Sequence, residues 1–209
     1  MAIIYNVYHE YPQQYKIAKI VEEIRNGAVV LYPTDTVYAI GCDLRNRQGI
    51  NRIRQIKRMD SRKQLSFLCD SMSNIAEYAH VSDRAYRIIR RLIPGPYTFL
   101  LPASKSVPRI VQDSKKKTTG IRVPDNAICN AILEELGSPL VSTSARLPDG
   151  KEPEMIDELF EQMEKLVDVI VDDDQRLRKT FSTIIDMTGS EFTIVREGQG
   201  MEKALQYVY

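Results

Sequence analysis

The 209-residue sequence predicts an α/β fold with a twisted, mixed sheet. Short apolar runs alternate with segments of helical periodicity through the first two thirds of the chain, and further strand-like runs cluster near its end. No internal repeat, low-complexity tract or long linker divides the sequence, and 43% of its residues are hydrophobic, which is enough for a core. We therefore expect a single domain that spans residues 1–209.

Helices are expected where apolar residues recur every three or four positions and a cap, a glycine or a proline marks an end. Ile17, Ile20 and Ile24 share one face of the first such segment, which Gly27 ends, and Ser82 is the expected N-cap of a later one. The helices expected on these grounds cover residues 12–27, 48–59, 82–95, 125–137 and 153–167.

Strands are expected where short apolar runs end at a proline, a glycine or a group of polar residues. The apolar run at residues 28–31, bounded by Gly27 and Pro33, is typical of a buried strand. The stretch 172–181 is polar and lacks periodicity, so we expect a mobile loop there. The strands expected on these grounds cover residues 28–33, 64–70, 97–103, 118–125, 139–145, 167–173, 182–188 and 193–198.

The composition narrows the class of protein. Cys42, Cys69 and Cys129 lie far apart without a Cys-x-x-Cys pair, so we expect buried thiols in a reducing compartment rather than disulfides or a zinc site. The chain has only 2 histidines, so a histidine-rich metal site is not expected. It also contains neither an apolar run of membrane-spanning length nor a charged-then-apolar leader. These features predict a soluble, cytoplasmic protein without a membrane partner.

The net charge of +1 conceals two oppositely charged stretches. Residues 45–117 contain 17 Lys and Arg against 5 Asp and Glu, whereas residues 149–175 contain 11 Asp and Glu against 2 Lys and Arg. Such blocks are often solvated helix faces. The alternative is a basic surface that contacts phosphate groups, either of a nucleotide or of a nucleic acid backbone.

Three apolar runs end in hydroxyl-rich turns, namely VVLYPTDT, PLVSTSA and FSTIID. In α/β sheets, ligands bind outside strand ends, and Ser and Thr hydroxyls there can bond phosphate or carboxylate oxygens. The chain contains no GxxxxGK[ST] loop, no GxGxxG after a strand and no GxSxG elbow, so the common nucleotide sites and that type of hydrolase are disfavoured.

Two arginines, Arg122 and Arg196, lie on or beside apolar strands. An arginine is costly to bury unless it is paired, and its planar guanidinium suits a carboxylate or a phosphate. Arg122 could therefore bind a ligand, or it could pair internally with Asp35 or Asp43. The segment 34–36 could likewise be an ordinary turn, because Asp and Thr side chains bond to local backbone.

A set of stretches resembles, in order, the motifs of the YrdC-like family: YPTDTVYAIGCD, PGPYTFLLP, TTGIRVPD, SPLVSTSA, and STIIDMT with IVREG. The resemblance covers residues 17–200, nearly the whole chain. It implies an α/β sheet curved around a concave, positively charged cavity. It also implies a threonylcarbamoyl-adenylate synthase, which joins threonine, bicarbonate and ATP, releases pyrophosphate, and serves the threonylcarbamoyl modification of tRNA adenosine.

The resemblance also implies site residues, although none is assigned as catalytic beyond positioning groups. Thr34, Thr36 and Arg122 would hold threonine. Asp35 would orient the turn or pair an arginine, and Tyr38 would be a lid or a packing residue. A carbamate oxygen that attacks the α-phosphate needs alignment and charge neutralisation more than a strong base. Magnesium would be held by the nucleotide phosphates, with no metal ligand from the protein. The residues that would surround these phosphates are Lys57, Ser142, Ser144, Ser182 and Arg196.

Two positions depart from the family pattern. The family's enzymes carry a Lys-x-Arg pair after the second helix; Lys57 fits this pair, but Met59 stands where arginine is expected. Arg58 or Arg62 could substitute, although neighbouring side chains point in different directions. Arg146 stands where the family has the asparagine of Ser-Ala-Asn, and arginine cannot accept a hydrogen bond. The YciO-like branch of the family shares departures of both types.

The leading interpretation is therefore a nucleotidyltransferase of the threonylcarbamoyl-adenylate synthase type. The alternative is a module that binds double-stranded RNA or tRNA through the basic surface, with weak or no synthase activity. A third interpretation, a hydrolase that acts on the same modification or nucleotide, finds no separate nucleophile in the sequence.

Overall fold

In the computed structural model, which describes residues 1–59, 64–113, 115–147 and 150–209, ten strands form one sheet. The order of its strands is β1 (Ile3–Asn6), β8 (Val169–Asp172), β2 (Val30–Tyr32), β3 (Ala39–Gly41), β7 (Leu140–Ser144), β4 (Ser66–Leu68), β6 (Thr118–Arg122), β5 (Tyr97–Pro102), β9 (Thr183–Asp186) and β10 (Thr193–Arg196). β7 is the strand on which the two parts of the sheet meet, because it pairs with β3 on one side and with β4 on the other.

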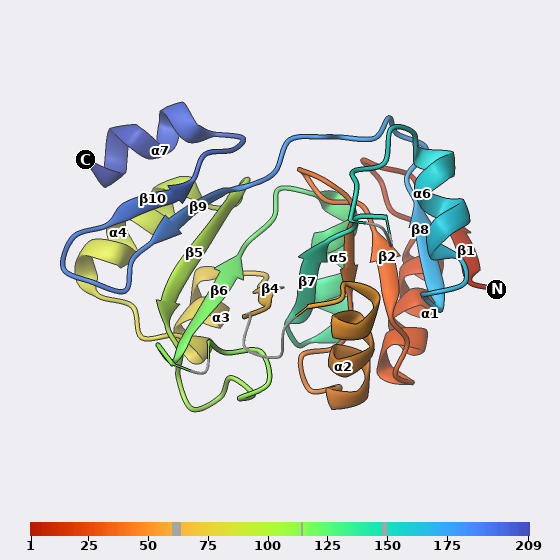
Figure 1. Cartoon of the computed structure of the whole chain (residues 1–209), viewed down its shortest axis with the longest axis horizontal. Helices are drawn as coiled ribbons and strands as arrows, with labels where there is room; N and C mark the ends of the chain where they lie inside the picture. The colour runs from red at the N-terminus through yellow and green to blue at the C-terminus, as the bar shows by residue number, and fades with distance from the viewer. Residues whose placement is uncertain (60–63, 114, 148–149) are drawn as a thin grey trace.

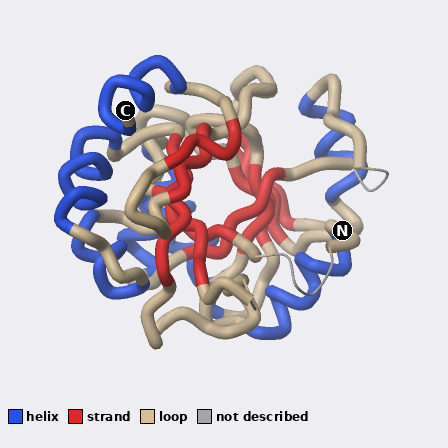
Figure 2. The backbone as a smooth tube through the Cα atoms, turned by 60° about the vertical axis from the view of Figure 1, so that its left-hand side comes forward, coloured by secondary structure: helices blue, strands red, loops and turns tan. Residues whose placement is uncertain are grey.

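The sheet is mixed, as predicted. β1 and β2 are both parallel to β8, and the pairs β4–β6 and β5–β9 are parallel as well. The remaining neighbours are antiparallel. Figure 2 shows the strands curving around the middle of the molecule, with helices on the outside. The predicted α/β class with a twisted, mixed sheet is therefore confirmed.

The helices fall into two groups, one beside each part of the sheet (Figure 1). One group accompanies β1, β2, β7 and β8 and consists of α1 (Gln14–Arg25), α2 (Arg47–Ile56), α5 (Ala127–Leu136) and α6 (Ile156–Met163). The other accompanies β5, β9 and β10 and consists of α3 (Met72–Tyr78), α4 (Asp83–Leu92) and α7 (Met201–Val208). Within the described part of the chain, no helix has the length and apolar character that a bilayer crossing requires.

β2 is buried on both faces. Val30 and Tyr32 belong to a cluster that α1 and α5 complete, and Leu31 belongs to a second cluster with residues of α2 and α6. A strand covered on both faces needs a continuous apolar run instead of an alternating one. The sequence pattern at residues 28–31 reflects this burial, and the predicted buried strand is confirmed.

Two helix caps, one at the start of α4 and one after α5, lie where the sequence predicts them. Ser82 accepts a hydrogen bond from the Ala85 amide at the start of α4, as expected of an N-cap. Gly137 follows α5 with a φ of 67°, a left-handed conformation that costs glycine less than other residues. The three cysteines are buried, also as predicted.

The sequence patterns miss four elements: β1, β3, α3 and α7. Ile3 and Ile4 of the edge strand β1 are 47% and 51% exposed, so no buried apolar face marks this strand. β3 has three residues and begins soon after the polar turn that follows β2. α3 and α7 have 7 and 8 residues, lengths at which helical periodicity is a weak signal.

The pairing of β10 with β9 contains a bulge. Ile194 lies opposite Ile185, but the next residue with a partner is Arg196, which lies opposite Ile184. Regular pairing would place Val195 opposite Ile184 instead. The extra residue reverses the alternation, so Arg196 shares a face of the sheet with Ile184 and not with Ile194.

The segment 173–182 connects β8 in one half with β9 in the other, along the top of Figure 1. Asp173 is buried at its start, where it accepts a hydrogen bond from Tyr38 Oη at 2.7 Å and contacts His9 Nδ1 at 2.9 Å. Further along, Arg178 Nη1 donates to the Thr34 carbonyl at 3.4 Å. The expected loop is confirmed, and its mobility stays a prediction.

Candidate active site

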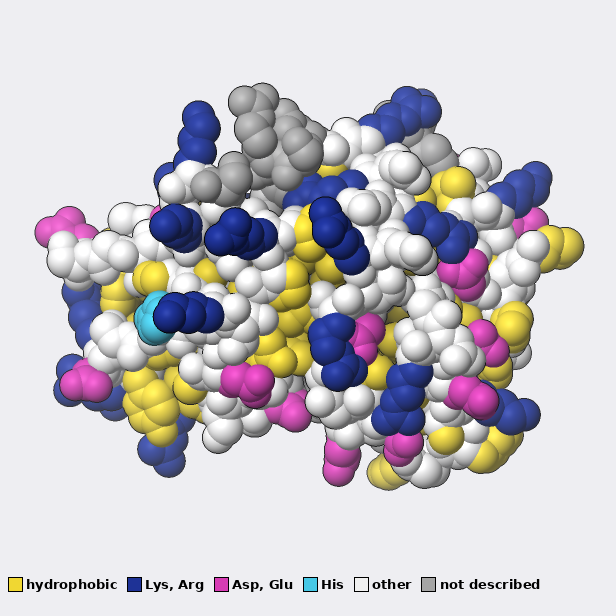
Figure 3. Space-filling view, turned by 90° about the horizontal axis from the view of Figure 1, so that it is seen from below, with side chains coloured by type: hydrophobic (Ala, Val, Ile, Leu, Met, Phe, Trp, Pro, Cys, Tyr) yellow, Lys and Arg dark blue, Asp and Glu magenta, His cyan; other side chains and the backbone are white. Residues whose placement is uncertain are grey.

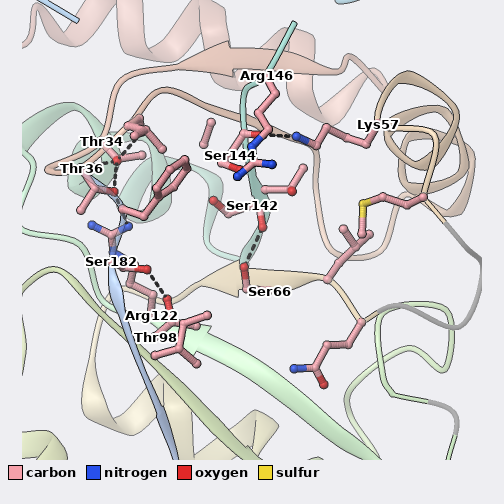
Figure 4. A pocket seen from close by; sticks show the side chains of 18 of the residues that line it. Thr34, Thr36, Lys57, Ser66, Thr98, Arg122, Ser142, Ser144, Arg146 and Ser182 are labelled. Carbon is pink, nitrogen blue, oxygen red and sulfur yellow. Dashed lines mark hydrogen bonds between the residues drawn. The ribbon is translucent and has the colours of Figure 1, made fainter. Parts of the chain in front are cut away.

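A cavity of about 410 Å³ lies between the two halves of the sheet, and Figure 4 shows it from close by. Its lining comes from the turn after β2, the end of α2, the strands β3, β4, β5, β6, β7, β9 and β10, and the segments after β7 and before β9. All eight residues that the sequence assigns to ligands line it, namely Thr34, Thr36, Lys57, Arg122, Ser142, Ser144, Ser182 and Arg196. The fold therefore brings the hydroxyl-rich strand ends together.

The turn after β2 is held by its own hydroxyls. Thr34 Oγ1 accepts a hydrogen bond from the Thr36 amide at 3.0 Å and donates to the Val37 carbonyl at 2.7 Å. The hydroxyls of Thr34 and Thr36 lie 3.1 Å apart and both residues are buried. The segment is thus an ordered turn and part of the cavity wall at once.

Arg122 is hydrogen-bonded to that turn. Its Nη1 donates to Thr36 Oγ1 at 2.8 Å, and its Nη2 bonds to Asp35 Oδ1. Both charged residues are buried. Of the two internal partners that the sequence allows, Asp35 is therefore the right one, because Asp43 pairs with Arg45 at 2.9 Å. The predicted role of Asp35 as the partner of an arginine is confirmed.

Serine and threonine side chains tie neighbouring strands together at the cavity. Ser66 Oγ donates to the Ser142 carbonyl at 2.8 Å, and the hydroxyls of Thr98 and Ser182 lie 2.9 Å apart. Ser66 and Thr98 also line the cavity, although the sequence analysis did not single them out. Thr98 could have been found, because it lies inside the PGPYTFLLP stretch.

Lys57 and Arg196 reach the cavity from opposite halves. Lys57 is the C-cap of α2, and its Nζ donates to the Ser144 carbonyl on β7 at 2.6 Å (Figure 4). Arg196 donates through Nε and Nη2 to the Ser182 carbonyl at 3.0 and 2.9 Å, and through Nη2 to Ser182 Oγ at 2.9 Å. The β10 bulge supplies the orientation that these bonds require.

Basic side chains dominate the charged lining. Among the described residues, the lining contains no Asp or Glu and five basic residues, namely Lys57, Arg58, Arg122, Arg146 and Arg196. Loss of hydration and the charges of Arg122 and Arg146 lower the pKa of Arg196. Asp35 neutralises Arg122, so the number of basic lining residues does not by itself give the net charge of the cavity. The positive charge of the cavity as a whole therefore stays a prediction.

Phe181 lies where two of these arginines meet. The guanidinium carbon of Arg146 is 5.3 Å from the centre of the Phe181 ring, and that of Arg196 is 5.4 Å from it. Both distances are within the range of cation–π contacts. The sequence offered no signal for this role beyond the place of Phe181 directly before Ser182.

A family model named for Sua5, YciO and YrdC, with the description "Telomere recombination", matches residues 22–198. The chain belongs to the Sua5/YciO/YrdC family. YciO of Escherichia coli K12, an uncharacterised protein, is 37% identical over 201 residues, which are 96% of this chain and 97% of YciO. A putative threonylcarbamoyl-AMP synthase of Methanocaldococcus jannaschii is 34% identical over 178 residues, 85% of this chain and 83% of that protein.

Solved structures of the Sua5/YciO/YrdC family have the same fold. The crystal structure of E. coli YciO matches with a TM-score of 0.90 and 36% identity, and the match covers 98% of this chain and 99% of YciO. The structure of P. abyssi Sua5 complexed with L-threonine matches with a TM-score of 0.87 and 27% identity over 99% of this chain and 62% of Sua5. The predicted YrdC-like fold is therefore confirmed.

The two departures from the family pattern both face the cavity. Met59 and Arg58 line it, and Met59 also packs against the apolar core, whereas Arg62 lies outside the described residues. Arg146 also lines it, just after β7, where Figure 4 shows its side chain beside Ser144. The cavity thus has an apolar residue at one position where the family pattern has a cation, and a cation at another where the pattern has an amide.

Tyr38 is a packing residue. It is 5% exposed, is not part of the lining of the large cavity, and donates to Asp173. Its ring also meets that of Phe160 edge-on at 5.7 Å. Burial and the neighbouring Asp173 carboxylate raise the pKa of Tyr38, so the side chain stays a neutral donor.

Proposed function

We propose that this protein is an enzyme of the L-threonylcarbamoyladenylate synthase type, with ATP, L-threonine and bicarbonate as substrates. The observation that carries the proposal is the convergence of all eight motif residues on one cavity. The threonylcarbamoyl-AMP synthases among the relatives and the L-threonine in P. abyssi Sua5 support it.

The reaction divides into two steps. The amine of threonine attacks the carbon of bicarbonate, and water leaves, which gives a carbamate. A carbamate oxygen then attacks the α-phosphorus of ATP, the bond from that phosphorus to the bridging oxygen breaks, and pyrophosphate departs with the electron pair. Thr34, Thr36 and Arg122 orient the threonine, and their fixed hydrogen bonds preorganise them for this.

The nucleotide phosphates bind to the remaining five motif residues. Lys57 and Arg196 neutralise phosphate charge, and the hydroxyls of Ser142, Ser144 and Ser182 donate to phosphate oxygens. The described residues contain no group of three or more His, Cys, Asp or Glu placed to bind a metal ion. A magnesium ion would be held by the nucleotide phosphates and water, where it would neutralise phosphate charge.

The test is to incubate pure protein with ATP, threonine and bicarbonate and to follow pyrophosphate and the adenylate together. Formation of both, and of neither when threonine is left out, would support the proposal. If no adenylate forms at enzyme concentrations that saturate the assay for a Vibrio vulnificus threonylcarbamoyl-AMP synthase, the proposal is wrong.

A second candidate function is binding of tRNA or double-stranded RNA, which would also link the protein to tRNA modification in the cytoplasm. Figure 3 shows Lys and Arg side chains gathering in the upper part of one face of the molecule. Not all basic side chains of the 45–117 stretch are available, because Arg84 and Arg91 stack on Phe192 and Tyr207. Retention of RNA that does not weaken from low to high salt would contradict binding through phosphates.

A further inference from the structure

Two guanidinium groups share one aromatic ring at the cavity. Arg146 follows β7 and Arg196 ends β10, so the two arginines come from different halves of the sheet, and both contact Phe181. Two like charges that share one ring repel each other, and this repulsion is one cause of the lowered pKa of Arg196. An anion that binds both guanidinium groups would remove that cost.

Among the described residues, neither arginine is paired with a buried carboxylate. Arg196 donates to the carbonyl and hydroxyl of Ser182, which are uncharged acceptors. Arg146 is 3.6 Å from Glu152, but these side chains are 44% and 49% exposed. An ion pair at that exposure adds little stability and is readily exchanged for another partner.

Arg146 lies near Lys57, and Met59, where the family pattern has a cation, is two residues after Lys57. Figure 4 shows the Arg146 side chain beside Ser144 and near Lys57, whose Nζ bonds to the same strand. The family resemblance predicts a second cation two residues after Lys57, where this chain has a methionine. Arg146 brings a guanidinium to the Lys57 side of the cavity from the segment after β7.

We propose that Arg146 and Arg196, which both contact Phe181, bind adjacent phosphates of a phosphoanhydride, and that Arg146 replaces the cation absent at Met59. The inference rests on the proposed function of the cavity as a nucleotide site and names the ligand class that the site prefers. Each guanidinium presents a fork that suits one phosphate. The site therefore selects ligands with linked phosphates, such as ATP and inorganic pyrophosphate, over AMP.

Calorimetric titration with ATP, inorganic pyrophosphate and AMP tests this. Replacing Arg146→Gln should weaken binding of ATP and pyrophosphate about tenfold to a hundredfold and leave AMP binding almost unchanged. Arg90→Gln, on the exposed face of α4, is the matched control and should change none of the three affinities. Equal losses for ATP and AMP, or no loss for ATP, would overturn the proposal.

Glu152→Gln separates an anion-binding role of Arg146 from a structural one. If Arg146 binds phosphate, removing its exposed partner frees it, so ATP affinity should rise a few-fold while Arg146→Gln lowers it. If the pair only stabilises the fold, both variants should lower the melting temperature alike and ATP affinity should not separate them. That result would also overturn the proposal.

The outcomes distinguish this inference from the proposed synthase activity. Adenylate synthesis combined with an unchanged ATP affinity of Arg146→Gln would contradict the inference alone. A selective loss of ATP and pyrophosphate binding in a protein that makes no adenylate would uphold the inference and contradict the synthase. A wild-type protein that binds neither ATP nor pyrophosphate would overturn both.

Discussion

At the scale of single residues, Arg122 combines a place in the cavity lining with a structural ion pair. It lines the cavity and is also half of a buried ion pair with Asp35. One oxygen of Asp35, Oδ2, is buried without a hydrogen-bond partner in the described structure. Asp35 therefore depends on Arg122 for its neutralisation.

Replacing Arg122→Ala should lower the free energy of unfolding by about 3 kcal/mol, because it leaves the Asp35 carboxylate buried without its partner. Urea unfolding measures this loss. The double variant Arg122→Met with Asp35→Asn removes both charges and should recover part of the stability. A single variant as stable as the wild type would show that the ion pair is not structural.

A second prediction at this scale concerns Met59. If Arg146 replaces the cation absent at Met59, Met59→Arg should restore ATP affinity to the Arg146→Gln variant by about tenfold. Titration of ATP into the single and double variants measures this. An unchanged affinity in the double variant would mean that the two positions do not serve the same phosphate.

At the scale of elements, a hydrogen bond joins the connection between β3 and α2 to the segment just before β7. Asp43 accepts hydrogen bonds from the Arg45 side chain at 2.9 Å and from Ser138 Oγ at 3.0 Å. Burial opposes ionisation of Asp43, but these hydrogen bonds outweigh it and lower the pKa of the carboxyl. The ionised form is therefore the one that stabilises the fold.

Stability should consequently depend on this contact in a definite pH range. The contribution of Asp43 is present above the unfolded-state pKa of about 3.9 and is lost as the pH falls through the lowered folded-state value. Arg45→Gln should thus destabilise the protein at pH 7 and lose most of that effect in acid. Urea unfolding across this range measures it, with the exposed Arg47→Gln as control. A loss independent of pH would contradict the assignment.

At the scale of the whole molecule, the segment between β8 and β9 joins the two halves and passes beside the site. Tyr38 fixes its first residue, Asp173, and Arg178 fixes its middle to the Thr34 carbonyl. These contacts, together with those of Phe181 at its end, hold a stretch that has no regular secondary structure. Its local stability should therefore be low and should depend on each anchor.

Tyr38→Phe should accelerate amide hydrogen exchange across residues 174–181 about fivefold, because it removes one hydrogen bond and keeps the ring. Exchange in the core strand β2 should stay the same. Tyr86→Phe, at a partly exposed position on α4, is the control. Unchanged protection of the segment would show that the contact between Tyr38 and Asp173 does not anchor it.

Much of the fold and the candidate site could be predicted, because hydroxyl-rich strand ends and ordered motifs are local patterns. The partner of Arg122 could not, because Asp35 and Asp43 are both far from Arg122 in sequence and only the tertiary fold decides between them. The face of the sheet on which Arg196 lies could not be predicted either, since a single extra residue in β10 reverses the alternation of side chains between the two faces. The contacts of Phe181 with two arginines could not be predicted, because they come from segments far apart in the sequence.

The place of β7 has a consequence for how this protein can change. β7 is the seam of the sheet, and it also carries Ser142 and Ser144 and leads into Arg146. A substitution there alters the joint between the two halves and the chemistry of the cavity in the same step. Tuning of ligand preference should therefore accumulate just beyond the strand, at positions such as Arg146, where side chains can vary without breaking the seam.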